Sequence, residues 1–537
     1  MIIDDLFKYP SYRMGQKEAI HNIWEAMHDN DKHYVFLDAP TGFGKSPVAY
    51  NIADASVVLN NHNVYLLTAT KMLQNQYVIE CDNDNHVSYS VGLGRGNFYC
   101  GLNDNPCTDG ECKRKDPDEK FSCPYGMRNN NPMDNGGCEY WACKGRTIAS
   151  DVAILNYNVL MSDLAYVGHY GHRDLMIADE AHNIESKIMN EISISLSERT
   201  LNKQLGFTFK DKDFDELSIK YWLDKINILI GNCELRIDNH QDFGLNQKGL
   251  DSLISLKGDL EWKYSEIENN PREWVVCPNK FQRNISIKPI KIKKWAYNKL
   301  FSASDYHVLM SGTFIDYEQF CNDLGINIDD TAYVRAESSF DMVTHNPIKE
   351  AYCGSMGYSS KQRTLPATIP VIKSILDKHE GECGLIHANS MEFTKYIMNN
   401  INSDRLITYD SLNKDSMINE FKDSDDKVMV SYSLQEGLNL PYDGIRFQVF
   451  YKVPYPFLGD NQIKARLKLD PNWYNMKTVQ IIIQAWGRGM RAEDDYCMNY
   501  LLDSNFKNVI YGNRFRHLLP NEFKEAVLLQ NGQSTLV

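Results

Sequence analysis

The chain has 537 residues, enough for three or four domains, and its 43% hydrophobic and 24% charged residues are typical of a globular protein. Its net charge of −14 excludes a uniformly basic nucleic-acid binder, although a local basic strip is enough for phosphate contacts. The first residues lack the pattern of a signal peptide, and no apolar run approaches the roughly 20 residues that cross a bilayer. We therefore expect a cytoplasmic protein with no membrane association.

Short apolar runs alternate with helical stretches through most of the chain. A helix is expected over residues 13–28, and buried strands are expected at 33–39, 64–70, 173–180, 307–313, 384–388, 427–433 and 446–453. This alternation is typical of parallel sheets covered by helices. Because it resumes after about residue 345, the pattern predicts a second α/β domain.

Two segments interrupt this alternation. Residues 97–146 are rich in Asn, Asp, Gly, Pro and Cys and show almost no apolar periodicity, so they need something other than a hydrophobic core to order them. Residues 191–300 carry apolar side chains at helical spacing, for example at Trp222, Ile226 and Leu229. We expect this second segment to be a mostly helical insertion.

Six of the thirteen cysteines fall in one stretch of 44 residues inside the first interrupting segment: Cys100, Cys107, Cys112, Cys123, Cys138 and Cys143. In a chain without a secretion signal, such clustering indicates a metal site rather than disulfides. Thiolates suit both iron–sulfur clusters and Zn²⁺, and their spacing does not choose between the two.

The turn after the first strand reads Ala-Pro-Thr-Gly-Phe-Gly-Lys-Ser over residues 39–46, which is a phosphate-binding P-loop with an alanine in place of its first glycine. Gly42 and Gly44 let the backbone N–H groups curl around phosphate. Lys45 is expected to reach the β- and γ-phosphates, and Ser46 to bind Mg²⁺.

About 130 residues later a strand ends in Asp-Glu-Ala-His, residues 179–182. Asp179 is expected to hold Mg²⁺, and Glu180 to orient and deprotonate the attacking water. In the second α/β domain, Gln484 precedes two arginines three residues apart, Arg488 and Arg491. Both arginines are expected to lie on one helix face and to converge on the γ-phosphate.

Residues 281–300 form a basic strip that contains one Arg, five Lys and no acidic residue. Around Lys288 and Lys291 the lysines alternate with Ile, so we expect several of them to share one strand face. Together with Lys293, Lys294 and Trp295 they are predicted to line a nucleic-acid path by phosphate contact and stacking. The alternative is an ordinary solvated face.

These motifs, in this order, resemble the XPD/DinG family of superfamily 2 helicases. The likeness extends to four further stretches, which resemble the family's Q-motif region and motifs Ia, III and V: residues 12–16, 68–76, 311–313, and 435–437 with 453–456. The family usually has an aspartate shortly after the Glu-Gly of motif V, where this chain has Asn439, and Asp443 is the candidate replacement.

The resemblance implies an α/β fold of two RecA-like motor domains, with an iron–sulfur insertion and a helical arch in the first. The implied segments are motor domain 1 at 1–96, 147–190 and 301–344, the cluster domain at 97–146, the arch at 191–300, and motor domain 2 at 345–537. The short arch favours a compact viral or bacterial member.

The resemblance also implies ATP, Mg²⁺ and a 4Fe–4S cluster as cofactors. The implied ATP-binding residues are Arg13, Gln16, Thr41, Gly42, Gly44, Lys45, Ser46, Asp179 and Glu436, with Ser46 and Asp179 on Mg²⁺. The implied catalytic residues are Lys45, Asp179, Glu180, His182, Gln484, Arg488 and Arg491.

Four thiolates are expected to hold the cluster: Cys100, Cys112, Cys123 and Cys138. Cys100 and Cys138 stand in sequence that resembles the family's, and Cys123 stands in a turn context. Cys107 competes with Cys112 for the fourth place, which Cys112 takes here because it divides the Cys100–Cys123 interval more evenly. Cys143 is expected to pack as a small hydrophobic residue.

The sequence thus predicts a monomeric ATP-dependent DNA helicase that moves 5′ to 3′ on single-stranded and forked DNA, with RNA left open as a substrate. Two alternatives remain: a single-strand translocase or remodeller with weak unwinding, and a nucleic-acid-binding iron–sulfur redox sensor.

Overall fold

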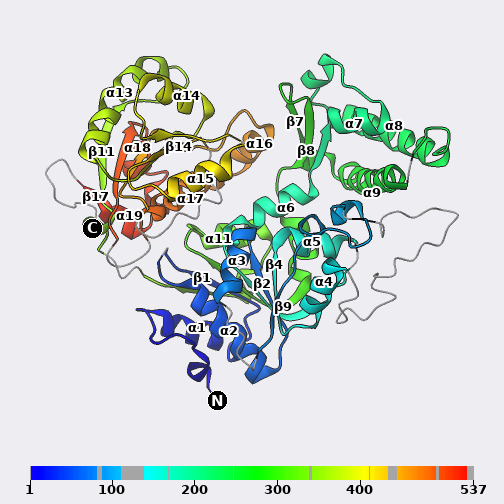
Figure 1. The fold of residues 1–537 in the computed structure, drawn as a ribbon, viewed down its shortest axis with the longest axis horizontal. Coiled ribbons are helices and arrows are strands. Elements are labelled where there is room, and N and C mark those ends of the chain that lie inside the picture. The colour runs from blue at the N-terminus through cyan, green and yellow to red at the C-terminus, as the bar shows by residue number, and fades with distance from the viewer. Residues whose placement is uncertain are drawn as a thin grey trace.

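The computed structural model describes residues 2–40, 42–80, 87–103, 105–110, 138–166, 168–245, 247–337, 341–410, 412–432, 444–490 and 495–528. In the ribbon, an N-terminal lobe, a C-terminal lobe and a third lobe of helices and short strands are distinct (Figure 1). Within the described residues, no helix combines the length and the apolar character needed to cross a membrane.

Seven parallel strands form the sheet of the N-terminal lobe: β1 (Tyr34–Asp38), β2 (Val64–Thr68), β3 (Tyr89–Val91), β4 (Val152–Asn156), β5 (Arg173–Ala178), β9 (Ser304–Ser311) and β10 (Thr331–Arg335). Their order is β10-β1-β9-β5-β2-β4-β3. Because β9 lies between β1 and β5, the carboxyl ends of these three strands meet at one edge, where ligands of such sheets bind.

The C-terminal lobe has a second sheet of seven parallel strands: β11 (Ile348–Gly354), β12 (Gly384–His387), β13 (Leu406–Ile407), β14 (Val428–Ser431), β15 (Phe447–Phe450), β16 (Met498–Asp503) and β17 (Val527–Leu528). Their order is β13-β14-β12-β15-β16-β11-β17. Every strand expected from the sequence is present, and the prediction of two parallel α/β domains is confirmed.

Helices accompany both sheets. Those of the first domain are α1 (Gln16–His28), α2 (Lys45–Asn60), α3 (Lys71–Glu80), α4 (Glu139–Ala149), α5 (Tyr157–Tyr166), α6 (Ile184–Ile192) and α11 (Tyr317–Leu324). After α12 (Met342–His345), the second domain has α13 (Lys361–Lys378), α14 (Met391–Asn400), α15 (Lys414–Lys422), α16 (Asn461–Leu469), α17 (Pro471–Trp486), α18 (Phe506–Tyr511) and α19 (Asn521–Ala526).

Residues 191–300, the segment expected to be a helical insertion, include the third lobe. The segment contains β6 (Ile194–Ser197), α7 (Glu198–Leu205), α8 (Ile219–Asp238), α9 (Gln247–Asn269), β7 (Trp274–Asn279), β8 (Asn284–Pro289) and α10 (Lys293–Lys299). The predicted helical character is correct, and Trp222, Ile226 and Leu229 are fully buried along α8. The antiparallel sheet of order β6-β8-β7 was not expected.

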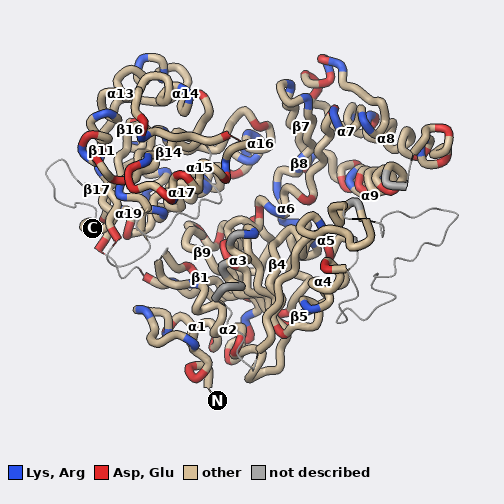
Figure 2. Tube along the Cα trace, in the orientation of Figure 1, with Lys and Arg blue, Asp and Glu red and all other residues tan. Residues whose placement is uncertain are grey.

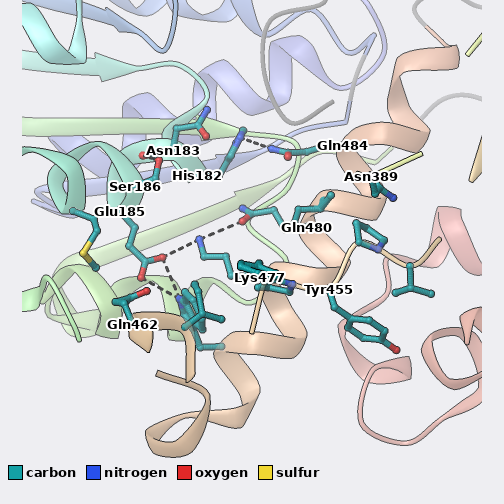
Figure 3. A pocket seen from close by; sticks show the side chains of 18 of the residues that line it. His182, Asn183, Glu185, Ser186, Asn389, Tyr455, Gln462, Lys477, Gln480 and Gln484 are labelled. Atoms are coloured by element: carbon teal, nitrogen blue, oxygen red, sulfur yellow. Dashed lines mark hydrogen bonds and ion pairs between the residues drawn. The ribbon is translucent and has the colours of Figure 1, made fainter. Parts of the chain in front are cut away.

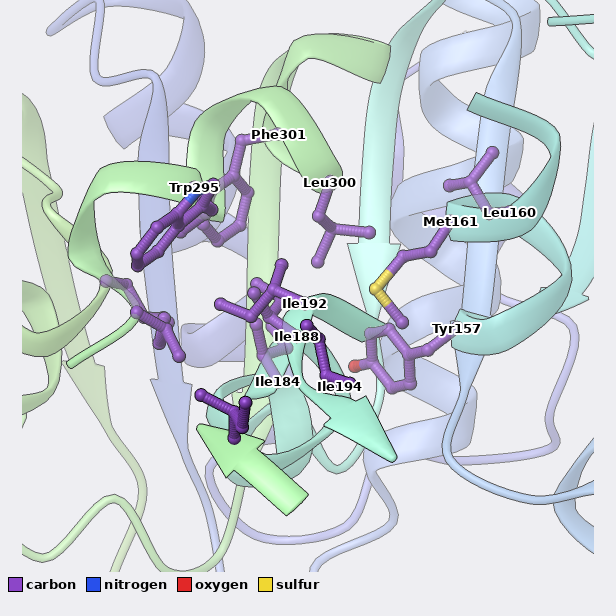
Figure 4. Close-up of a cluster of buried hydrophobic side chains, with 14 of the residues drawn as sticks. Tyr157, Leu160, Met161, Ile184, Ile188, Ile192, Ile194, Trp295, Leu300 and Phe301 are labelled. Carbon is purple, nitrogen blue, oxygen red and sulfur yellow. The ribbon is translucent and has the colours of Figure 1, made fainter. Parts of the chain in front are cut away.

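The insertion shares a hydrophobic core with the first domain. On α6, Ile184, Ile188 and Ile192 repeat every four residues and are fully buried, as the period of a helix requires. They lie among Tyr157 of α5 and Trp295 of α10 (Figure 4). Because one continuous core spans both parts, α6 holds the insertion firmly on the first domain.

The basic strip has a different structure from the one predicted. Lys288 lies on β8 and forms an ion pair of 2.6 Å with Asp460, whereas Lys294 lies on α10 and pairs with Glu266 at 2.9 Å. Trp295 is buried and its Nε1 donates to the same glutamate. Acidic residues distant in the sequence therefore pair with Lys288 and Lys294, and the buried Trp295 is not open for stacking, contrary to the prediction. The strip also does not form one strand, because β8 ends at Pro289 and Lys293 and Lys294 lie on α10. A nucleic-acid path along Lys291 and Lys293 stays a prediction. Basic and acidic residues are also interspersed over all three lobes (Figure 2).

Candidate active site

The P-loop connects β1 directly to α2, which begins at Lys45. Gly42 and Gly44 have φ values of 85° and 86°, a region that glycine enters without steric cost. The Lys45 Nζ donates to the Ala39 carbonyl at 3.1 Å. The loop therefore has the turn at the head of a helix that phosphate binding requires.

Two of the residues implied to bind ATP donate hydrogen bonds to the backbone of the loop. Gln16 is buried, and its Nε2 donates to the carbonyls of Phe43 and Gly44 at 2.9 and 3.1 Å. Arg13 Nη1 donates to the Gly42 carbonyl at 2.6 Å. Thr41, a further predicted ligand, lies outside the described residues.

The two expected Mg²⁺ ligands face the same hydroxyl group. Tyr77 on α3 is buried, donates to Asp179 Oδ2 at 3.1 Å and is also hydrogen-bonded to Ser46. Ser46 and Asp179 are thus separated by a single phenol oxygen. A hydroxyl and a carboxylate are hard oxygen donors of the kind that Mg²⁺ takes with phosphate, so these residues fit the ion.

Asp179 and Glu180 occupy the turn at the end of β5. Burial and the charge of Glu180 raise the pKa of Asp179 to about 6, against the opposing charge of Lys45. Tyr157 donates to the Asp179 carbonyl at 2.8 Å and fixes the strand end. Glu180 has a φ of 51°, a left-handed conformation uncommon outside glycine and typical of constrained sites.

His182 bridges the two domains. Its Nδ1 lies 2.9 Å from Ser311 Oγ and 3.2 Å from a Glu180 carboxylate oxygen, and its Nε2 accepts from the Gln484 side-chain amide. Burial, Lys477 and Lys45 lower the pKa of His182 to about 3, so the ring is neutral. Since a carboxylate only accepts, we assign the single ring proton to Nδ1.

A second contact joins α17 to the end of β9. Gln480 Nε2 donates to the Thr313 carbonyl at 2.9 Å, and Gln484 Nε2 lies 3.4 Å from Thr313 Oγ1. The end of β9 in turn lies close to the P-loop. This approach depends on Gly312, where a Cβ atom would stand 2.7 Å from the Ala39 carbonyl. The P-loop, the end of β9 and α17 thus form one contiguous structure.

A cavity of about 550 Å³ lies between the domains beside this bridge (Figure 3). It is lined by His182, Asn183, Glu185, Ser186 and Met189 of the first domain and by residues of the second that include Asn389, Tyr432, Lys452, Tyr455, Trp473, Lys477, Gln480 and Gln484.

The remaining predicted ATP-site residues belong to the second domain. Arg488 follows α17 and lies close to His387 at the end of β12, whose pKa is lowered to about 3 by burial and by the Arg488 charge. Arg491 and Glu436 lie outside the described residues, as do Asn439 and Asp443. The roles of these residues stay predictions.

Two of the clustered cysteines share a short loop. A Cβ atom at Gly110 would stand 3.3 Å from Cys100 Sγ and 3.4 Å from the Cys107 carbonyl. Cys138 directly precedes α4, and Cys143 Sγ donates to the Val91 carbonyl. Cys112 and Cys123 lie outside the described residues. Within the described part of the chain, no group of three or more candidate ligands could hold a metal ion.

Several site residues escaped the sequence reasoning. Tyr77 carried no signal beyond its place on a helix after the second strand. Glu185 and Gln480 did carry one: Glu185 comes three residues after His182, and Gln480 lies one helical turn before Gln484 on α17. Their partners lie more than 160 residues away in the sequence, which explains why the pairs were not foreseen.

Two protein-family models match the chain. Residues 10–208 match the res subunit of type III restriction enzymes, and residues 372–522 match the helicase C-terminal domain. A probable ATP-dependent helicase of Methanocaldococcus jannaschii, MJ0942, is 25% identical over 211 residues, or 36% of this chain. The match spans about a third, 32%, of that relative's length.

Solved structures share the fold over nearly the whole chain. An XPD helicase superposes with a TM-score of 0.65 at 18% identity, covering 95% of this chain and 99% of its own. Apo XPD gives 0.61 at 17% identity over 93% and 98%, and Xpd4 of S. tokodaii gives 0.58 at 13% identity over 96% and 99%. At these identities the likeness shows the fold alone.

The two parallel-sheet domains and the family matches fit those of a superfamily 2 helicase. Within that class, they fit an XPD/DinG-like helicase, and the resemblance predicted from the motifs is confirmed. The helicase matches also support an ATP-hydrolysing enzyme.

Proposed function

We propose that the protein is a DEAH-type, ATP-dependent DNA helicase that moves 5′ to 3′ along single-stranded DNA and opens forked DNA as a monomer. The observation that carries the proposal is the His182 bridge. A neutral histidine next to the water-activating Glu180 accepts a hydrogen bond from Gln484 of the other domain. This hydrogen bond links ATP hydrolysis at the first domain to the position of the second domain.

In this proposal the P-loop backbone and Lys45 bind the phosphates, and Ser46 and Asp179 hold Mg²⁺. Glu180 accepts a proton from the attacking water, and Arg488 and Arg491 stabilise the charge that develops on the γ-phosphate. ATP binding closes the domains, and hydrolysis lets them open. Tyr77 orients the two magnesium ligands through its hydroxyl group.

We further propose that single-stranded DNA passes through the interdomain cavity. The cavity combines Lys452, Asn389 and the aromatic Tyr455, the mixture of cation, amide and ring that binds phosphates and stacks bases. Burial lowers the pKa of Lys452, so a phosphate next to it also relieves the cost of the buried charge. The helical insertion is proposed as the arch under which the strand advances.

The cysteine segment is proposed to hold a 4Fe–4S cluster on Cys100, Cys112, Cys123 and Cys138, with Cys107 as the alternative to Cys112. The donor set fits because all are thiolates in a segment without apolar periodicity. The cluster would supply a cross-link in place of a hydrophobic core. Lys71, after β2, donates to Asn97 at 2.6 Å and so connects the segment to the first domain.

The test combines strand displacement with ATP hydrolysis by the full chain. Glu180→Gln is expected to bind ATP and DNA but to hydrolyse at least ~10³-fold more slowly, with no unwinding. Wild-type unwinding of a substrate with a 5′ overhang, and not of one with a 3′ overhang, would support the polarity. Hydrolysis without strand separation would favour the translocase instead, and near-normal turnover by Glu180→Gln would contradict the site.

A further inference from the structure

Glu185 connects the first domain to α17 of the second at a point the catalytic mechanism does not use. Its carboxylate accepts from Trp473 Nε1 at 3.0 Å and forms an ion pair of 2.9 Å with the Lys477 ammonium. We infer that Glu185 is a positioning residue that holds α17 in the register at which Gln484 reaches His182. The inference rests on the proposed ATP hydrolysis and deepens it.

Glu185 stands on an element that cannot easily move. It lies on α6, which the buried Ile184, Ile188 and Ile192 anchor on the first domain. Only 8% of its side chain is exposed, and its two partners come from α17 alone (Figure 3). A buried carboxylate on a fixed helix is therefore a rigid reference point for the helix it contacts.

Four residues of α17 that contact the first domain form one stripe. Trp473, Lys477, Gln480 and Gln484 follow one another at intervals of four, three and four residues, so they share one helix face. The first two bind Glu185, and the last two bind Thr313 and His182. A shift of the helix that loosens the Glu185 contacts also withdraws Gln484.

The charge balance favours an ionised Glu185. Burial alone would raise its pKa, but the charges of Lys477 and Arg466 and the hydrogen bonds of Lys477 and Trp473 lower it. Arg466 is itself buried and pairs with Asp323 of α11. Removing the Glu185 charge would leave the Lys477 ammonium, with 17% of its side chain exposed, without its carboxylate partner.

The experiment measures kcat and KM for ATP with the full-length protein. Glu185→Gln is expected to lower kcat about tenfold and to leave KM within about twofold, because the P-loop is not touched. Trp473→Phe keeps the packing but loses the donor, and it is expected to act in the same direction. In a Gln484→Ala background, Glu185→Gln is expected to add little, since both changes act on the same contact.

Lys288→Met is the matched control. It breaks an interdomain ion pair of 2.6 Å, to Asp460 of α16, without touching α17, and it is expected to leave ATP hydrolysis in the absence of DNA within twofold of wild type. Thermal unfolding of every variant shows whether it is folded.

Three results would overturn the inference: unchanged kcat in Glu185→Gln, an equal fall in Lys288→Met, or effects of Glu185→Gln and Gln484→Ala that multiply. A wild type without ATP hydrolysis would refute the proposed function instead. In that case amide hydrogen exchange still decides the positioning role. Glu185→Gln should speed exchange in the last two turns of α17 and leave α2 unchanged, and equal exchange in α17 would refute it.

Discussion

The contact between His182 and Gln484 allows a quantitative test of communication between the domains. Gln484→Ala removes the hydrogen bond to the neutral imidazole, whereas His182→Ala removes that bond and the one to Ser311. An unsatisfied buried partner costs about 1–3 kcal/mol. We therefore expect kcat to fall about tenfold in Gln484→Ala and about 10²-fold in His182→Ala, at roughly 1.4 kcal/mol for each factor of ten.

The double variant is the informative one. If the two side chains act through their mutual bond, His182→Ala/Gln484→Ala should hydrolyse ATP about as slowly as His182→Ala alone, which corresponds to a coupling of about 1.4 kcal/mol. Steady-state hydrolysis at saturating ATP, with and without single-stranded DNA, gives all four rates of the cycle. A double variant slowed by about 10³-fold, the product of the single effects, would refute the bridge.

Three further predictions concern the core, a buried histidine and the cysteines. Trp222→Ala should destabilise the protein by about 3–5 kcal/mol in thermal unfolding, since the ring is fully buried in the core shared with the insertion, and a loss below about 1 kcal/mol would contradict that core. The pKa of His387 is lowered to about 3 in the folded protein, so the unfolded chain takes up the proton first as the pH falls below about 6.5. The stability that comes from keeping His387 neutral is complete above that pH and is lost towards pH 3. In urea titrations, His387→Gln should therefore lose about 1.4 kcal/mol less unfolding free energy than wild type between pH 7 and 5.5. An equal loss in the two proteins would contradict this prediction. Cys100→Ser should remove bound iron and its visible absorption. Cys143→Ser should keep both, because the Cys143 thiol donates its hydrogen bond to the Val91 carbonyl. A wild type without iron would contradict the cluster.

The two sheets could be predicted because strands buried on both faces are continuous apolar runs that follow each other along the chain. The P-loop and the residues at 179–182 were equally accessible, since each motif is local and comes directly after a strand. The β8 strand shows what was misread. Its isoleucines alternate with Asn284, Ser286 and Lys288, which is the period of a half-buried strand, and Ile285 and Ile287 are fully buried within the core that the insertion shares with the first domain.

The contacts between the domains could not be predicted in the same way. His182 and Gln484 are 302 residues apart, and Glu185 and Trp473 are 288 apart. One sequence alone does not indicate which residues so far apart are in contact. Lys288, a candidate phosphate contact, likewise forms an ion pair with Asp460, which the sequence did not indicate.

The α16–α17 hairpin is attached at both of its ends. At the start of α16, Asp460 pairs with Lys288, Asn461 Nδ2 donates to the Val276 carbonyl at 2.8 Å, and Gln462 Nε2 donates to the Ile290 carbonyl at 3.1 Å, all within the helical insertion. At the far end of α17, Gln484 holds His182. Because the insertion and the first domain share a core, these contacts join the second domain to one continuous unit at two separate places. An opening of the ATP site that moves the second domain as a whole must therefore release the contacts of α16 on the insertion as well as those of α17 on the first domain.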